Sequence, residues 1–213
     1  MEEEIEIIQL RSDHILKIRQ DDIYSADING DCCFLVYDHR DFTVEVDGFK
    51  PRDIYEYLTY PEKPIKTDYY DLDDYQEAVD DWDYHKPQDF SDYFIYIVYA
   101  YIHSGVSLSL THNGDRWDTS ASGYILVSKE DMSSKEDAYS LAESVINEWN
   151  NYLCGNVFWF ELLKQSNCLE CGHIKETFVD SCGGFIGDDI YSCGIFDHID
   201  GDLIPAKIKK LIR

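Results

Sequence analysis

The segment Tyr93–His103 reads YFIYIVYAYIH, an uninterrupted run of aromatic, β-branched and small apolar residues without Gly or Pro. Aromatic and β-branched side chains favour extended backbone. An apolar run of this length is typical of a strand that is buried within a sheet. We therefore predict a buried strand here, and the other elements are assigned outward from it.

Shorter strand-like patterns occur on both sides of this segment. They occupy residues 5–8, 13–18, 32–37, 42–46, 106–110, 123–128, 156–163 and 174–179. Asn29-Gly30 and Asp47-Gly48 separate the N-terminal runs, and such pairs between apolar runs are typical of hairpins. Helices interrupt the strands irregularly. This pattern predicts an α+β fold, mostly antiparallel sheet with a few packed helices.

The predicted helices have recognisable start and stop signals. Pro51 suits the first turn of a short helix, which would point Ile54, Tyr55 and Leu58 inward. A second helix begins after Ser133 or Ser134, which can cap it, and stops at Gly155. The last segment, 204–212, is predicted to be a short amphipathic helix.

Prolines at positions 61 and 64 mark the best internal boundary. We expect three regions: a β-rich N-terminal region over residues 1–66, an acidic helical segment over 67–92, and a C-terminal α+β domain with a Cys-rich end over 93–213.

The chain is strongly acidic, with 18 Lys and Arg against 43 Asp and Glu and a formal net charge of −25. It is also 44% hydrophobic and 15% aromatic, which indicates a folded protein rather than a disordered acidic tail. Binding to nucleic acid uses Lys and Arg to displace counterions, so direct binding is not expected. The charge favours a basic protein partner.

Several features predict a cytoplasmic protein without a membrane span. No stretch of about 18 apolar residues exists, and the N-terminal Met1-Glu2-Glu3-Glu4 is acidic where a signal peptide is basic. The seven Cys are expected to be mostly reduced in that compartment.

Residues 68–92 hold ten acidic residues and one base, Lys86. Four apolar residues in this segment fall at helical spacing and define one stripe: Leu72, Tyr75, Val79 and Trp82. Asp73, Glu77 and Asp81 lie four residues apart on another face. These carboxylates would form a row along the helix, about 6 Å apart.

Four cysteines form the clearest metal candidate, with the spacing Cys-x2-Cys-x10-Cys-x10-Cys: Cys168, Cys171, Cys182 and Cys193. A Cys-x2-Cys turn can hold one side of a tetrahedral zinc ion, and two later cysteines can complete the site. His173 is a possible substitute ligand. A structural zinc is expected in preference to a catalytic one, and thiols without a metal are the alternative.

The chain contains no phosphate-binding GxxxxGK[ST] loop and no Rossmann glycine fingerprint. Cys182 lies beside Asp180 and Ser181, but no recognised catalytic sequence surrounds it. We therefore expect a protein that is not an enzyme.

Several sequence blocks resemble a family of mostly uncharacterised proteins from bacteriophages and mobile elements. The blocks are 103–108, 115–120, 123–130, 152–157 and 180–187, so the resemblance covers about residues 95–190. The chain departs from the family at Gly183, where the family usually has Trp. The acidic segment lies outside this region and is similar only in general composition to antirestriction and anti-CRISPR DNA mimics.

Together, the charge and the resemblance predict an inhibitor of a host nucleic-acid-binding defence enzyme, either a CRISPR nuclease or a restriction enzyme. It would act in the host cytoplasm as a DNA mimic that blocks a basic groove. The expected contact residues are Asp73, Asp74, Glu77, Asp80, Asp81 and Asp83, with Tyr75 or Trp82 packed beneath them. The alternatives are a small zinc-dependent enzyme that uses the Cys/His-rich C-terminal region, and a phage accessory protein that is acidic merely for solubility.

Overall fold

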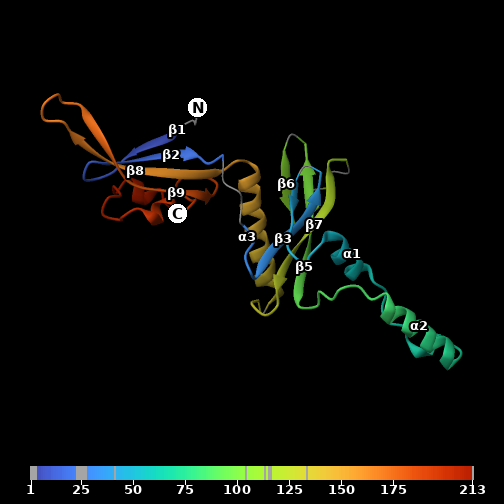
Figure 1. Ribbon diagram of the computed structural model, residues 1–213. Helices are drawn as coiled ribbons and strands as arrows, with labels where there is room; N and C mark the ends of the chain where they lie inside the picture. Colours follow the sequence, from blue (N-terminus) through green and yellow to red (C-terminus); the bar gives the residue numbers. More distant parts are fainter. Residues whose placement is uncertain are drawn as a thin grey trace. The chain divides into compact units, whose positions relative to one another are not determined.

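The computed structural model describes residues 4–22, 28–40, 42–103, 105–112, 114, 117–132 and 134–212. It confirms the α+β prediction, with antiparallel sheets accompanied by a few helices (Figure 1). None of the helices in these ranges is long and apolar enough to cross a bilayer.

The chain folds into two compact units, and each unit is assembled from separate stretches of sequence. Unit 1 contains Met1–Ile28, His103–Ser107 and Asn147–Arg213, and unit 2 contains Asn29–Ile102 and Leu108–Ile146. The predicted regions 1–66, 67–92 and 93–213 are continuous, so they differ from this division. The reason is that the N-terminal strands pair with a strand from the far end of the chain.

Unit 1 is built on a four-stranded antiparallel sheet with the order β1-β2-β8-β9. Its strands are β1 (Glu4–Gln9), β2 (His14–Gln20), β8 (Val157–Asn167) and β9 (Ile174–Ile186). Residues from β2 and β8, such as Leu16, Ile18 and Phe160, are fully buried. The C-terminal segment contributes Ile195, Phe196 and other apolar residues to the same cluster, so it covers one face of the sheet.

Unit 2 contains a five-stranded sheet with the order β4-β3-β7-β5-β6. Its strands are β3 (Cys33–His39), β4 (Phe42–Val44), β5 (Tyr93–Ile102), β6 (Val106–Ser109) and β7 (Thr119–Ser128), although the division by contacts assigns the first two residues of β6 to unit 1. β5 is the strand predicted from Tyr93–His103, and it lies between β7 and β6. Alternate residues Phe34, Val36 and Leu126 are buried in one cluster.

Helix α1 (Pro51–Thr59) packs over this cluster with Pro in its first turn and Ile54 fully buried. The prediction that Tyr55 and Leu58 also point inward is wrong, because these side chains are 58% and 46% exposed. Tyr57 packs against the cluster instead.

The Asn29-Gly30 signal does not join a hairpin, because β2 and β3 belong to different sheets. Asn29 instead uses its amide to pair with the backbone of Leu35, accepting from its N–H at 2.8 Å and donating to its carbonyl at 3.1 Å. The second signal is confirmed: Gly48 adopts a positive φ in the turn that closes the Val46–Phe49 bridge.

Helix α3 (Lys135–Leu153) has the predicted cap and stop. The Ser134 hydroxyl accepts from the N–H of Asp137 and donates to its carboxylate, and Gly155 follows the helix with a φ of 77°. The predicted helix over 204–212 is wrong in type, because only the short 3-10 turn Ile208–Lys210 forms there. Ile204, Ile208 and Ile212 still pack into the core of unit 1.

Candidate acidic interface

The acidic segment forms a regular helix, as predicted. Helix α2 spans Leu72–Tyr84 and begins at Asp71, whose carboxylate accepts from the N–H groups of Asp73 at 2.7 Å and Asp74 at 3.1 Å. This side chain satisfies two of the donors that the first turn leaves open. The carboxylates of Asp73 and Asp74 also lie at the positive end of the helix dipole.

The predicted apolar stripe is only partly confirmed. Val79 is buried, while Tyr75 and Trp82 are partly buried. Leu72 is 59% exposed and does not belong to the buried stripe, because it lies in the first turn, where no described element covers it.

Trp82 attaches α2 to the loop that precedes it. Its indole N–H donates to the Pro61 carbonyl at 2.8 Å, and the Tyr60 hydroxyl donates to the carbonyl of Trp82. The Tyr60 and Trp82 rings lie 5.4 Å apart. Lys63 and Lys86 each place the ammonium group 5.6 Å from the centre of the Trp82 ring. The two loops that flank α2 therefore meet at this indole.

Tyr60 shows how the acidic face influences its surroundings. Burial is the main cause that raises the pKa of its hydroxyl, and the nearby carboxylates of Asp81 and Asp83 raise this pKa further. Sequence reasoning did not identify the contacts of Tyr60 and Pro61 with α2. Both residues contact Trp82, which lies more than twenty residues later in the chain. Tyr84 lies seven residues after Glu77, and helical spacing places both on one face.

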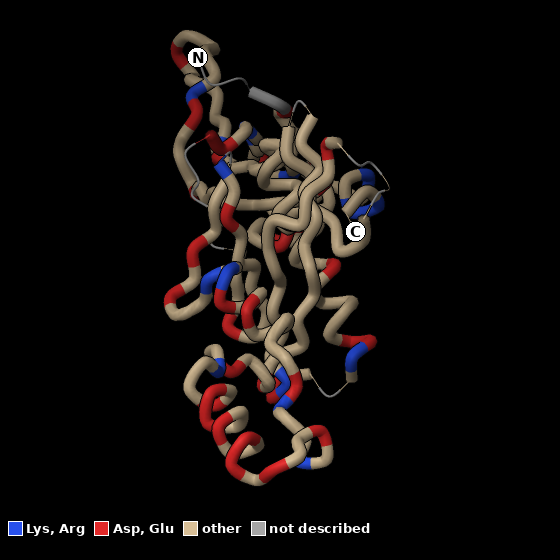
Figure 2. Tube along the Cα trace, turned by 90° about the vertical axis from the view of Figure 1, so that its right-hand side faces the viewer, with Lys and Arg blue, Asp and Glu red and all other residues tan. Residues whose placement is uncertain are grey.

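The predicted contact carboxylates are all exposed. At about 100° per residue, Asp73, Asp74, Glu77, Asp80 and Asp81 fall within an arc of roughly 120°. This arc lies opposite Tyr75, Val79 and Trp82. Asp83 lies outside it, toward the edge of the packed face. Figure 2 shows acidic positions on successive turns of α2.

These carboxylates border an open hollow of about 560 Å³ along the helix. Its lining residues are Asp74, Glu77, Ala78, Asp80, Asp81 and Tyr84. Ala78 forms the floor because its side chain is small, while Tyr84 is 85% exposed at one end. The hollow could receive cationic side chains between the carboxylates.

The arrangement of the acids is unfavourable for the helix itself. Asp81 and Asp83 lie in the last turn, where the helix dipole disfavours negative charge and where no basic residue is present. Asp73, Glu77 and Asp81 repel one another at a spacing of four residues. His85 approaches Asp81 at 3.3 Å, and Gln76 donates to Asp80 at 2.8 Å. These contacts compensate only part of the repulsion.

Replacing Trp82 with alanine is expected to loosen α2. The loss of one hydrogen bond and of the ring contacts corresponds to about 2 kcal/mol, or roughly 30-fold faster exchange of the α2 amides. Hydrogen–deuterium exchange read by mass spectrometry measures this change. Tyr70→Ala is the control, because Tyr70 is fully exposed and should leave the exchange unchanged. Equal exchange in both variants would show that Trp82 does not hold the helix.

The four predicted zinc ligands are not brought together. Cys168 and Cys171 lie in the turn between β8 and β9, whereas Cys182 lies opposite Phe160 far along β9. Eight extended residues separate Ile174 from Cys182, a distance of about 26 Å. Cys193 lies beside Gly187 and packs against the core of unit 1, and burial is the main cause that raises the pKa of its thiol. No group of three metal-ligating side chains occurs within the described ranges.

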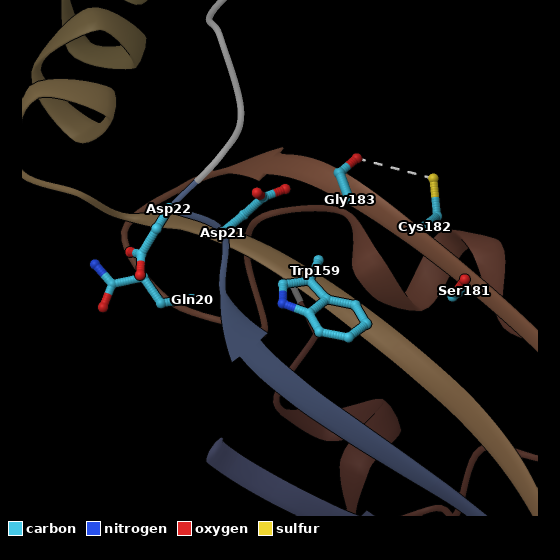
Figure 3. Close-up of a pocket in the computed structure, with 7 residues that line it drawn as sticks. All are labelled: Gln20, Asp21, Asp22, Trp159, Ser181, Cys182 and Gly183. Carbon is cyan, nitrogen blue, oxygen red and sulfur yellow. Dashed lines mark hydrogen bonds between the residues drawn. The ribbon is translucent and has the colours of Figure 1, made fainter. Parts of the chain in front are cut away.

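A second hollow, of about 390 Å³, lies in unit 1 (Figure 3). It is lined by Gln20, Asp21, Asp22, Trp159, Ser181, Cys182 and Gly183. The Asp21 carboxylate accepts from the N–H of Gly184 at 3.1 Å, and Gly184 has a φ of 79°. A Cβ at Gly183 would lie 2.6 Å from this carboxylate and 3.2 Å from Cβ of Trp159. A tryptophan at position 183, as in the resembling family, would therefore require Asp21 to move.

This second hollow lacks the elements of nucleophilic catalysis. Cys182 is exposed, but none of the described lining residues is a histidine that could act as its base. His173 lies at the far end of β9, and His198 packs against the ring of Phe185 at 5.0 Å. The acidic face of α2 is thus the more distinctive site. Comparisons with protein-family models, with curated proteins and with solved structures found no match to this chain.

Proposed function

We propose that this chain is a phage- or mobile-element-encoded inhibitor of a host nucleic-acid-binding defence enzyme, such as a CRISPR nuclease or a restriction enzyme. The acidic face of α2, defined as Asp73, Asp74, Glu77, Asp80 and Asp81, occupies the basic groove that otherwise holds DNA. The genetic setting rests on the resemblance of residues 95–190. The mechanism rests on the exposed carboxylates.

The observation that carries this proposal is the density of charge on one helix face. Five carboxylates occur over the nine residues Asp73–Asp81, a length of about 12 Å, which corresponds to one charge in about 2.4 Å. Duplex DNA carries one charge in about 1.7 Å of its axis, or one in about 3.4 Å for each strand. The acidic face therefore lies between the charge density of one strand and that of a duplex.

The length of this face also limits the part of a groove that it can fill. A length of about 12 Å corresponds to roughly three to four base pairs at 3.4 Å each. This size favours a short recognition surface, such as the groove that reads a PAM, over a long channel. Tyr75 and Trp82 lie on the opposite, partly buried face of α2.

A pull-down from host lysate with competing DNA tests the proposal. The captured protein is expected to bind DNA, and an excess of duplex DNA should displace it from the chain. Simultaneous binding of DNA and of this chain to the captured protein would contradict occupation of the groove.

The affinity for the captured partner is expected to depend strongly on salt. Raising the salt concentration from about 0.1 M to about 0.5 M should raise Kd at least about tenfold, because screening reduces the attraction between exposed charges. Titration calorimetry at the two concentrations measures this change. An affinity that is independent of salt would favour a protein that is acidic only for solubility.

A further inference from the structure

The hairpin formed by β8 and β9 extends beyond its neighbours in sheet β1-β2-β8-β9. The pairing of β2 with β8 ends at His14 and Lys164, whereas β8 and β9 remain paired to Asn167 and Ile174. Figure 1 shows this hairpin in orange, projecting past the other strands of its sheet. Leu169 in the terminal turn is fully exposed. The tip is therefore accessible to another molecule.

The tip has the geometry of a metal-binding Cys-x2-Cys turn. The N–H of Cys168 donates to the His173 carbonyl at 2.8 Å, and the N–H of Gly172 donates to the Cys168 carbonyl at 2.9 Å. Gly172 has a φ of 70°, which lets the chain reverse directly after the second cysteine. Cys168 is partly exposed and Cys171 is exposed, so both thiols are accessible to a metal ion at this tip.

The turn carries both cysteines at its tip, three residues apart in the sequence, and both thiols are free. A tetrahedral zinc ion with Zn–S bonds of about 2.3 Å places two of its sulfurs about 3.8 Å apart. A Cys-x2-Cys turn can supply one such edge of the tetrahedron.

The chain itself does not complete this site. In the ranges that the structure describes, no third His, Cys, Asp or Glu joins the pair to form a possible metal group. Cys182 lies about 26 Å along β9, too far to contribute. Two further ligands must come from another molecule.

We propose that Cys168 and Cys171 form half of a tetrahedral zinc site, which the same two cysteines of a second copy of this chain complete. A twofold axis through the metal brings identical turns together and supplies four thiolates. The local charge permits this approach: residues 164–176 contain Lys164, Lys175, Glu170 and Glu176, with no net charge. The rest of the chain carries the entire excess of −25. This inference does not depend on the proposed function of α2.

The test uses full-length, metal-free protein kept reduced, to which Zn²⁺ or Co²⁺ is added at moderate salt. Sedimentation and metal analysis are expected to show one metal for two chains and a doubled mass, both reversed by a chelator. Co²⁺ should give the intense thiolate charge-transfer absorption of a tetrahedral sulfur site. Cys168→Ser and Cys171→Ser should each remove the dimer and this absorption.

Cys154→Ser and Cys182→Ser are the matched controls, because both cysteines are exposed and lie away from the tip. These variants should still dimerise with zinc. One metal for each monomeric chain would overturn the shared site, as would loss of metal binding in His173→Ala. Absence of zinc binding by the reduced protein, or a dimer that persists after chelation, would also overturn it.

Discussion

Replacing Glu77, Asp80 and Asp81 together with lysine is expected to weaken binding to the captured partner by at least about 100-fold, because like charges would then face the basic groove. These three residues border the hollow on the acidic face. The measurement is Kd for the captured protein, together with inhibition of its nuclease activity.

The same variant is expected to be slightly more stable than the original chain. Lysines in the last turns of α2 interact favourably with the helix dipole, and Asp73 then attracts the lysine at position 77, while the lysines at positions 77 and 81 repel each other as the acids did. The midpoint temperature of thermal unfolding should therefore rise or stay constant, while inhibition of the partner is lost. This opposite response separates a lost contact from a lost fold.

A control variant changes the net charge by the same amount at other exposed acids of unit 2. Glu45, Glu130 and Asp131 are exposed, and no hydrogen bond or ion pair of their carboxylates supports a described element. Their replacement with lysine should leave Kd within about threefold of the original, because long-range charge is screened at physiological salt. Equal losses in both triple variants would mean that net charge, rather than the face of α2, determines binding.

Gly123→Ala is expected to reduce the free energy of unfolding by about 1–3 kcal/mol, which is the typical range for overpacking a core. A Cβ at this position would lie 2.6 Å from the carbonyl oxygen of Val36 and 3.1 Å from Cα of Tyr37. Both are backbone atoms of β3, which pairs directly with β7. Relief therefore requires the two strands to separate, not merely a side chain to rotate.

Urea unfolding monitored by fluorescence and by circular dichroism measures this loss. Gly30→Ala in the same unit is the control, because a Cβ there would meet only the Cys33 carbonyl at 3.9 Å, an ordinary contact. A loss below about 1 kcal/mol for Gly123→Ala would show that β3 and β7 can accommodate a methyl group.

Local features of the chain were predictable because the interactions behind them span only a few residues. The run Tyr93–His103 indicated β5, the Pro51 signal indicated α1, and Ser134 and Gly155 marked the ends of α3. The acidic helix followed from the spacing of Tyr75, Val79 and Trp82. Its exposed carboxylates followed from the same periodicity.

The partners of these elements were not predictable from local pattern. Asn29-Gly30 has the composition of a hairpin turn between β2 and β3. However, β2 pairs with β8, which lies more than a hundred residues later in the chain. A turn signal describes backbone preference over four residues and contains no information about which strand is the better partner. The discontinuous units arise from this one choice.

The sequence determines how acidic the chain is. The tertiary structure determines what holds the acidic helix in place. Helical periodicity alone places five carboxylates on one face of α2. Only the tertiary structure determines that Trp82 meets Pro61 and Tyr60, and that an extended β9 separates Cys182 from the cysteine pair. The reason is physical: charge and helical spacing act along the chain, while these contacts require segments that meet only after folding.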